Sequence, residues 1–188
     1  FSINLFLIFI LIPFVEMFYA SLRPLDHLFR SPYQFFSDDL SFWAYREMWN
    51  TVPMLGRYIF NSFFLATVTS VITLLFVIPA AYSYARFTFP FKNSSLYILL
   101  AINMFSGAVL LIPLYKVLRT FGLLNTYQAM IVPGVAFLIP TSIWLLKSYF
   151  EKIPIDLEEA AFVDGASRVQ ILRHIIAPLS TPGLVVVG

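Results

Sequence analysis

A dense group of ionisable side chains lies between Ile153 and Pro182, in the sequence IPIDLEEAAFVDGASRVQILRHIIAPLSTP. Its carboxylates and guanidinium groups can form charged contacts that set the register of a protein–protein interface. The chain contains no cysteine, which excludes a thiol nucleophile, a disulfide and a cysteine-based metal site. Its histidines, His27 and His174, form no ligand pattern. The sequence therefore predicts no metal site, no catalytic residues and no cofactor.

The amino-acid composition indicates an integral membrane protein. Of the 188 residues, 60% are hydrophobic and 12% are charged, whereas soluble domains are about one-quarter charged. Long apolar runs between short polar segments predict an all-α chain that crosses a bilayer several times as a polytopic helical bundle. The formal net charge of +2 is too small to indicate a nucleic-acid partner.

Residues 153–178 are predicted to form a helical hairpin at the membrane surface. Asp156 is suited to cap the first helix, and Glu159, three residues later, completes a capping box. This first helix is expected over residues 157–164. Gly165 lies where the helix must stop and turn.

The second helix of the hairpin is expected over residues 167–176, ended by Pro178 and Pro182. At roughly 100° per residue, its apolar side chains share one arc and its polar side chains the other. The apolar arc consists of Val169, Ile171, Leu172, Ile175 and Ile176. The second helix is therefore predicted to be amphipathic.

The first helix is predicted to have a packed face and an offered face. Ala160 and Ala161, which share a side with Leu157 and Asp164, allow another backbone to approach closely. On the other side, Phe162 is an apolar knob surrounded by charge, and it is suited to enter a pocket of a partner. The members of this offered face are Glu158, Glu159, Phe162 and Val163.

The spacing within this stretch resembles the EAA loop of bacterial ABC importer permeases. The string EAA occupies residues 159–161. Three residues separate it from Gly165, nine residues separate Gly165 from Ile175, and two residues separate Ile175 from Pro178. The longer strings EEAAFVDGAS and APLSTPGL are similar to the carbohydrate-uptake branch, in particular to the second permease of maltose-type systems. Ala177 stands where a leucine commonly precedes the proline, which is a mild departure.

The resemblance implies the MetI-like ABC permease fold, with residues 1–188 forming a transmembrane permease domain. It implies that the hairpin docks into a groove on a cytoplasmic ATPase. Glu159 would make the charged contact, and Gly165 would set the angle between the two helices. The residues implied in ATPase coupling are Glu158, Glu159, Ala160, Ala161, Phe162, Asp164 and Gly165.

The implied partners are a second homologous permease subunit, two ATP-binding cassette ATPase subunits, an extracytoplasmic solute-binding protein and the lipid bilayer of the bacterial cytoplasmic membrane. No G-x-x-x-x-G-K-[ST] signature occurs in the chain, so ATP is expected to bind a partner. The resemblance thus implies a multi-pass, non-catalytic subunit that moves a sugar or oligosaccharide by alternating access.

The apolar runs predict spans at about residues 1–20, 58–85, 95–118 and 127–147, with a fifth span beginning at 183. Interruptions are expected in the third run at Asn103, Ser106, Gly107 and Pro113, and in the fourth at Pro133, Gly134 and Pro140. Because the resemblance implies a six-span subunit, the chain is expected to be a fragment of a longer protein.

Residues 21–56 are expected to lie outside the cytoplasm. Their aromatic residues recur at helical spacing between 42 and 49, which predicts a short helix in the membrane interface. Glu16, near the end of the first run, is interpreted as hydrated at the interface rather than as an intramembrane functional group. The 12 Lys and Arg residues divide equally between alternate loops, so orientation rests on the resemblance.

Other functions fit the sequence less well. An intramembrane enzyme would need nucleophilic or ionisable groups gathered at membrane depth, and no H-E-x-x-H or G-x-S-x-G motif occurs. An importer for glycerol phosphate, amino acids or peptides remains an alternative, because the EAA pattern alone allows it. The pathway-lining residues and the particular solute do not follow from the sequence.

Overall fold

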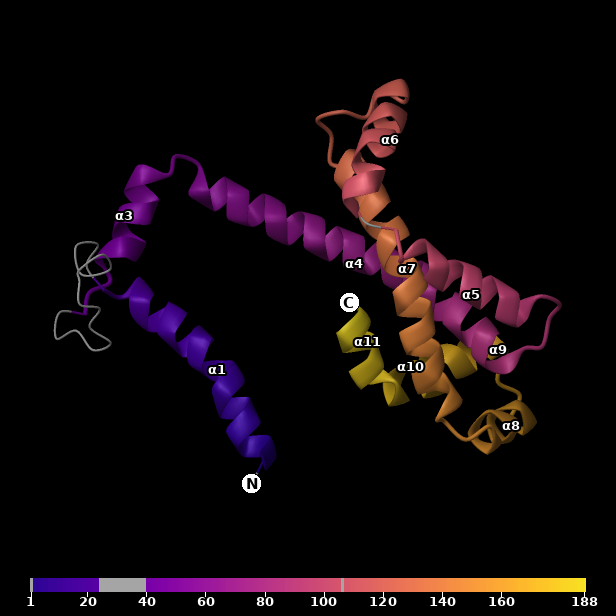
Figure 1. The fold of residues 1–188 in the computed structure, drawn as a ribbon. Coiled ribbons are helices and arrows are strands. Elements are labelled where there is room, and N and C mark those ends of the chain that lie inside the picture. Colours follow the sequence, from indigo (N-terminus) through magenta and orange to yellow (C-terminus); the bar gives the residue numbers. More distant parts are fainter. Residues whose placement is uncertain (1, 24–39, 106) are drawn as a thin grey trace. The chain divides into compact units, whose positions relative to one another are not determined.

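The structure is a computed structural model that describes residues 2–23, 40–105 and 107–188. Within these ranges every regular element is a helix (Figure 1), which confirms the all-α prediction. The chain divides into two compact units, residues 1–60 and 61–188. The first unit carries the N-terminal helices, and the second carries the predicted hairpin.

The first unit contains α1 (Ser2–Ser21) and α3 (Trp43–Thr51). The aromatic spacing thus correctly predicted a short helix at α3. The Ser21 hydroxyl lies 2.8 Å from the Tyr45 hydroxyl, and this hydrogen bond joins the end of α1 to α3. Residues 24–39 of the predicted external loop lie outside the described residues.

Glu16 is partly exposed and forms an ion pair in the first unit. Its Oε1 lies 3.5 Å from Nη2 of Arg23, whose side chain is buried. The Arg23 guanidinium also lies over the Tyr19 ring. Glu16 therefore has a charged partner seven residues along the chain, just beyond the end of α1, which the sequence interpretation did not include.

The long helix α4 (Leu55–Arg86) begins in the first unit and continues through the second. It covers the predicted run at 58–85 and extends it at both ends. Pro79 lies inside the helix without ending it. The last residue of α4, Arg86, carries the only charge in its final turn.

The predicted third span forms two helices, α5 (Lys92–Ile102) and α6 (Gly107–Thr120). The expected interruption at Asn103 is present, and Asn103 Nδ2 donates a hydrogen bond of 3.0 Å to Thr141 Oγ1 on the next helix. Ser106 lies outside the described residues. Pro113 was wrongly expected to interrupt the run, because it lies inside α6.

Helix α7 (Gln128–Glu151) is one element, so the predicted breaks at Pro133, Gly134 and Pro140 are wrong. A proline removes one backbone donor, and apolar helices tolerate this loss where the neighbouring hydrogen bonds persist. Gly134 serves packing instead, since a Cβ there would lie 3.2 Å from Cγ2 of Thr69 on α4.

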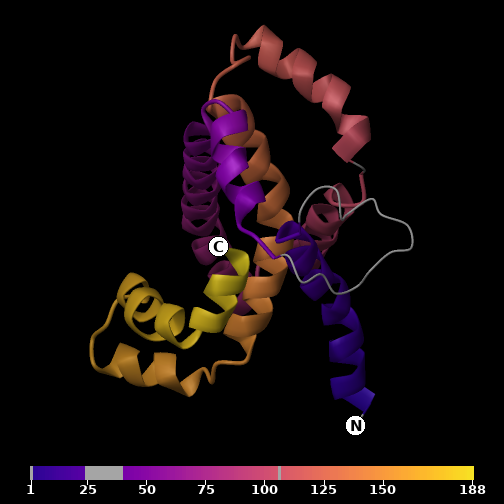
Figure 2. The same ribbon diagram turned by 90° about the vertical axis from the view of Figure 1, so that its left-hand side faces the viewer.

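The C-terminal part of the second unit is a series of short helices. They are α8 (Asp156–Val163), α9 (Arg168–Ile171), the π-helix η1 (Leu172–Ile176), α10 (Ala177–Leu179) and α11 (Thr181–Val187). The series leaves α7, turns back through α9, and returns beside α7 as α11 (Figures 1 and 2).

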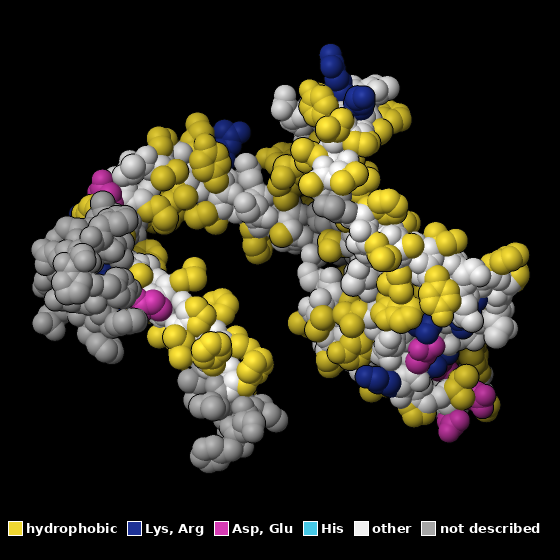
Figure 3. Space-filling model, viewed as in Figure 1, with side chains coloured by type: hydrophobic (Ala, Val, Ile, Leu, Met, Phe, Trp, Pro, Cys, Tyr) yellow, Lys and Arg dark blue, Asp and Glu magenta, His cyan; other side chains and the backbone are white. Residues whose placement is uncertain are grey.

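The buried core of the second unit lies where this returning series meets α4, α5 and α7. Its apolar members are Val77, Ala81, Tyr82, Leu96, Ile143, Leu146, Phe150, Ile171 and Ile176. By contrast, many large apolar side chains elsewhere are exposed, including those along α6 (Figure 3). One side of the hairpin is therefore packed against protein, whereas other helix surfaces offer apolar groups outward.

By length and composition, two helices among the described residues are apolar enough to cross a membrane, α4 and α7. The number rises to four if the pair α5 and α6 and the pair from Arg168 to Val187 each count as one bent span.

Helix α11 packs closely on α7 at Gly183. A Cβ at this position would lie 2.7 Å from Cγ and Cδ2 of Tyr149, near the stem of the ring. Farther along α11, the Ser70 hydroxyl of α4 donates a hydrogen bond of 2.7 Å to the Gly188 carbonyl. The glycine therefore lets α11 lie against α7.

We expect Gly183→Ala to destabilise the full-length protein in detergent by about 1–3 kcal/mol, because the Tyr149 ring must move to admit the methyl group. Thermal unfolding followed by size-exclusion chromatography measures the effect. Gly56→Ala is the matched control, since its Cβ would make an ordinary contact of 3.6 Å with Trp49. Equal unfolding temperatures for the two variants would contradict the predicted close approach.

Candidate functional site

The first hairpin helix, α8, begins without the predicted capping box. Ile155 already has helical backbone angles, and its carbonyl accepts from the amides of Glu158 and Glu159. Asp156 is consequently the first helical residue, and no side chain caps the helix. Its carboxylate still lies in the first turn, where negative charge is favourable.

The structure corrects the predicted position of Glu158. This residue was assigned to the offered face, but it is 3% exposed. Nε of Arg86 donates a hydrogen bond to Glu158 Oε1 within an ion pair. The Tyr82 hydroxyl donates a second hydrogen bond of 2.7 Å to Oε2. Two residues of α4 thus hold both oxygens of the Glu158 carboxylate.

Arg86 also reaches the backbone that leads into the hairpin. Its Nη2 donates a hydrogen bond of 2.8 Å to the carbonyl of Ile153. The Arg86 side chain is 9% exposed and the Glu158 side chain 4%, so the pair is almost removed from solvent. The end of α4 therefore binds both the connection from α7 and the first turn of α8.

The rest of α8 presents an outward surface. Glu159 and Phe162 are exposed, as predicted. The predicted packed side is wrong for Leu157, Ala160 and Asp164, which are exposed, and only Ala161 of that side is partly buried against the core. The most exposed apolar residue of the hairpin is Val163, at 89%. We call the exposed set Glu159, Ala160, Phe162, Val163 and Asp164 the outer face. It contains most of the predicted coupling residues, but Glu158 lies on the opposite side.

Gly165 ends α8 as predicted. Its φ of +83° lies in the left-handed region that favours glycine. The amide of Ala166 then donates to the Ala161 carbonyl at 2.9 Å, which closes the helix end. A β-carbon at Gly165 would meet no neighbouring atom, so the backbone angle alone requires glycine here.

The second hairpin helix begins with a capping box that the sequence analysis did not assign. The Ser167 hydroxyl accepts from the Gln170 amide, and the Gln170 side chain accepts from the Ser167 amide at 2.7 Å. Ile171 and Ile176 are fully buried, as the predicted apolar arc requires. Val169 was wrongly placed on that arc, because it is 74% exposed.

The second hairpin helix was predicted to end before Pro178, and this prediction is wrong. The helix widens into the π-turn η1 and continues through α10, which contains Pro178. A proline ring clashes with the carbonyl four residues earlier, which here belongs to His174. The wider turn over residues 172–176 relieves this clash, so the proline is accommodated.

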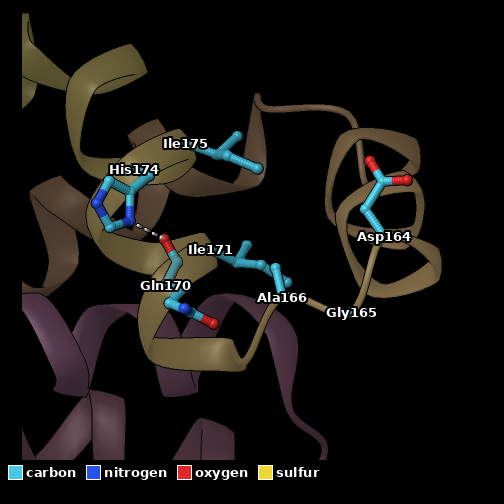
Figure 4. Close-up of a pocket in the computed structure, with 7 residues that line it drawn as sticks. All are labelled: Asp164, Gly165, Ala166, Gln170, Ile171, His174 and Ile175. Atoms are coloured by element: carbon cyan, nitrogen blue, oxygen red, sulfur yellow. Dashed lines mark hydrogen bonds between the residues drawn. The ribbon is translucent and has the colours of Figure 1, made fainter.

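A hollow of about 360 Å³ lies between the end of α8 and the second hairpin helix (Figure 4). Asp164 stands on one side of it, and His174 Nδ1 lies 3.0 Å from the Gln170 carbonyl on the other. Its lining is completed by Gly165, Ala166, Ile171 and Ile175. The hollow has an apolar floor and polar edges.

Arg168 joins the hairpin to the turn after α4. Its guanidinium lies 4.8 Å from the ring centre of Phe87 and 5.2 Å from that of Phe162. Such cation–π contacts are worth about 0.5–1 kcal/mol at exposed sites. Both hairpin helices therefore contact the end of α4, α8 through a buried ion pair and α9 through this exposed contact.

Sequence reasoning missed Tyr82 and Arg86. Neither residue is among the predicted coupling residues, which all lie within the hairpin. The available signal was a single arginine closing a long apolar run, because such a charge needs a partner when it is buried. Which of the neighbouring acids pairs with it depends on the fold.

The ionisable side chains of the hairpin occur both as an internal ion pair, between Glu158 and Arg86, and as surface groups, such as Glu159 and Asp164. No group of three His, Cys, Asp or Glu side chains that could hold a metal occurs among the described residues. Figure 3 shows acidic and basic side chains together over this part of the molecule.

Residues 77–187 match the family described as "binding-protein-dependent transport system inner membrane component". Because this match covers more than half of the chain, the protein belongs to that family, whose members are transporter permeases and not enzymes. The matched residues run from the last third of α4 to the last residue of α11. They include the ion pair, the outer face and the hollow.

Several relatives are named as permeases of sugar transport systems. The chain is 32% identical over 178 residues to the sulfoquinovosyl glycerol transport system permease protein SmoH of Agrobacterium fabrum, covering 95% of this chain. It is 34% identical over 174 residues to the trehalose/maltose transport system permease protein MalG of Thermococcus litoralis, covering 93% of this chain. The chain spans 62% of the length of each relative.

A solved structure has a similar fold. A chain of a bacterial ABC transporter involved in the import of the acidic polysaccharide alginate matches with a TM-score of 0.75 and 26% identity. The match covers 99% of this chain and 65% of that chain. The MetI-like permease fold predicted from the sequence is therefore confirmed.

We expect Glu158→Ala to destabilise the full-length protein by about 3–5 kcal/mol, because it leaves the buried Arg86 without its anionic partner. Glu159→Ala removes an exposed carboxylate one residue away, so we expect a change within about 0.5 kcal/mol. Chemical or thermal unfolding in detergent compares them. A larger loss for the Glu159 variant would show that the inward and outward carboxylates have been exchanged.

Proposed function

We propose that this protein is a transmembrane permease subunit of an ATP-binding-cassette importer, and that it moves a sugar or oligosaccharide across the bacterial cytoplasmic membrane. It crosses the bilayer several times and works by alternating access. ATP is bound and hydrolysed by partner ATPase subunits. A second homologous permease completes the pathway, and an extracytoplasmic solute-binding protein delivers the solute.

The observation that carries this proposal is the hairpin itself. Its inner side is fixed to α4 and the core, while its outer face offers Glu159, Phe162 and Val163 to solvent. Exposed apolar side chains beside carboxylates, on a helix whose other side is anchored through the buried Glu158, are suited to a specific partner surface. The membership of residues 77–187 in a transporter permease family makes an ATPase the fitting partner.

The shape of the hairpin supports docking by both of its helices. The hollow between Asp164 and His174 can receive a protruding side chain of the ATPase while Phe162 enters the groove on that subunit. Gly165 fixes the turn that brings these features together. ATP-driven closure of the partner then moves the hairpin, and the attached helices follow.

Carbohydrate is the solute class that we propose. The support is that several relatives, matched over 93% or more of this chain, are named for trehalose, maltose or sulfoquinovosyl glycerol transport. The alignments include helices α4 to α7, which are the apolar elements that a pathway would use. Transport of glycerol phosphate, amino acids or peptides is the alternative, and the uptake experiment described next distinguishes it from sugar transport.

The function is tested with the full-length protein co-expressed with its candidate permease, ATPase and binding-protein partners and reconstituted in proteoliposomes. We expect ATP-dependent accumulation of a labelled α-linked disaccharide that requires the binding protein. Amino acids, a dipeptide and glycerol phosphate serve as competing solutes. Uptake of one of these in preference to every sugar tested would overturn the carbohydrate assignment, and a complex without any ATP-dependent uptake would overturn the transport function.

We expect Glu159→Gln to weaken co-purification of the ATPase by about thirtyfold or more, because disrupting one member of a hydrogen-bonded charge pair at an interface costs about 2–5 kcal/mol. Glu47→Gln, the same change on an exposed acid of α3, is the control and should leave the complex intact. Quantitative pull-down from detergent extracts measures both. Undiminished binding by the Glu159 variant would remove the charged contact from the proposal.

A further inference from the structure

Two residues of α4 attach the hairpin by binding one carboxylate from two sides. We call this set of contacts the clamp. Arg86 and Tyr82, one turn apart on α4, hold separate oxygens of Glu158. Arg86 holds the Ile153 carbonyl at the same time. The first turn of α8 and the connection from α7 are therefore bound to the same end of α4 by charged and hydrogen-bonded contacts.

Burial makes this clamp resistant to opening. The Arg86 and Glu158 side chains are 9% and 4% exposed, and Tyr82 packs edge-on against Phe150 of α7 and against Phe87. Separating the pair would leave each charge poorly hydrated, which is strongly unfavourable. A displacement of α8 is thus transmitted to α4 more readily than it breaks the contact.

The neighbouring contacts keep the hairpin together as it moves. Arg168 on α9 lies over Phe162 of α8 and Phe87 beyond α4. Ile171 and Ile176 are fully buried in the same core as Val77 and Ala81 of α4. Force applied to the outer face therefore reaches α4 through both hairpin helices. The hydrogen bonds of the clamp have a fixed geometry, and they set the direction in which α4 is displaced.

Helix α4 is suited to carry such a displacement. It is 32 residues long, which at 1.5 Å per residue is about 48 Å and exceeds the thickness of a bilayer core. A small movement at its Arg86 end is carried along the axis of one hydrogen-bonded element. No other described helix combines this length with a charged contact to the hairpin.

We propose that Arg86, Glu158 and Tyr82 are positioning residues that couple the hairpin to α4, so that ATP-driven movement of the hairpin switches the helices around the pathway. This proposal rests on the proposed function. It assigns Glu158 a role inside the permease and leaves Glu159 for the ATPase. Loss of the clamp should accordingly uncouple hydrolysis from transport without releasing the ATPase.

The test uses the complete transporter in proteoliposomes and measures sugar moved per ATP hydrolysed. For Glu158→Gln we expect ATPase binding and hydrolysis to stay within about twofold of wild type, while the transport ratio falls by about fivefold or more, in the usual range of coupling between sites. Tyr82→Phe keeps the ion pair and removes one hydrogen bond, so its ratio should fall less.

The control is Glu151→Gln, which removes the carboxylate of an exposed pair with Lys147 at the end of α7 and should leave the ratio unchanged. Thermal unfolding of each purified complex separates uncoupling from misfolding. A Glu158→Gln transporter with the wild-type ratio would overturn the clamp, as would equal loss of hydrolysis and transport in both clamp variants. Failure of the wild-type complex to transport would instead overturn the proposed function.

Discussion

The second unit of this protein depends on the burial of one carboxylate. Glu158 is held by Arg86 and Tyr82 at a place where both charges are almost removed from solvent. A buried ion pair adds little net stability, because the loss of hydration offsets the attraction. Breaking it is costly, however, since the remaining charge has no partner. The pair therefore fixes where α8 lies more than it stabilises the fold, and the apolar core supplies most of the stability.

This constraint gives the hairpin its two unlike sides. On the inner side, Ile171 and Ile176 complete a core shared with α4, α5 and α7. On the outer side, Val163 and Val169 are exposed although both are apolar, and charged residues surround them. The same chain has apolar surfaces along α4 and α6 that suit lipid or other transmembrane helices. The hairpin differs from these surfaces because charge and apolar groups alternate over a short distance, which suits a protein partner with a defined register.

The sequence predicted the elements well and their orientations less well. The helix at α3, the end of α8 at Gly165 and the interruption near Asn103 follow from local rules about aromatic spacing, left-handed backbone and polar residues in apolar runs.

Tertiary packing overrode other local rules. Pro133 and Pro140 were expected to break α7, yet the surrounding hydrogen bonds keep it continuous. Pro178 was expected to end a helix, and a π-turn accommodates it instead. The face of α8 could not be predicted, because it depends on Arg86, which lies 72 positions away in the sequence.

The adjacent acids Glu158 and Glu159 show why local pattern was insufficient. They have the same chemistry, and a rotation of α8 by about 100° would bring Glu159 to the place that Glu158 occupies. The side chains of Ala160 and Ala161 are equally small, so apolar packing hardly distinguishes these two orientations of α8. The hydrogen-bond donors of α4 distinguish the two orientations strongly, because Arg86 and Tyr82 must reach separate oxygens of one carboxylate. A charged contact with fixed geometry therefore selects the rotation that apolar packing leaves open. With Glu158 turned inward, Glu159 lies about 100° around the helix and is exposed, so the face available to a partner is set from inside the permease.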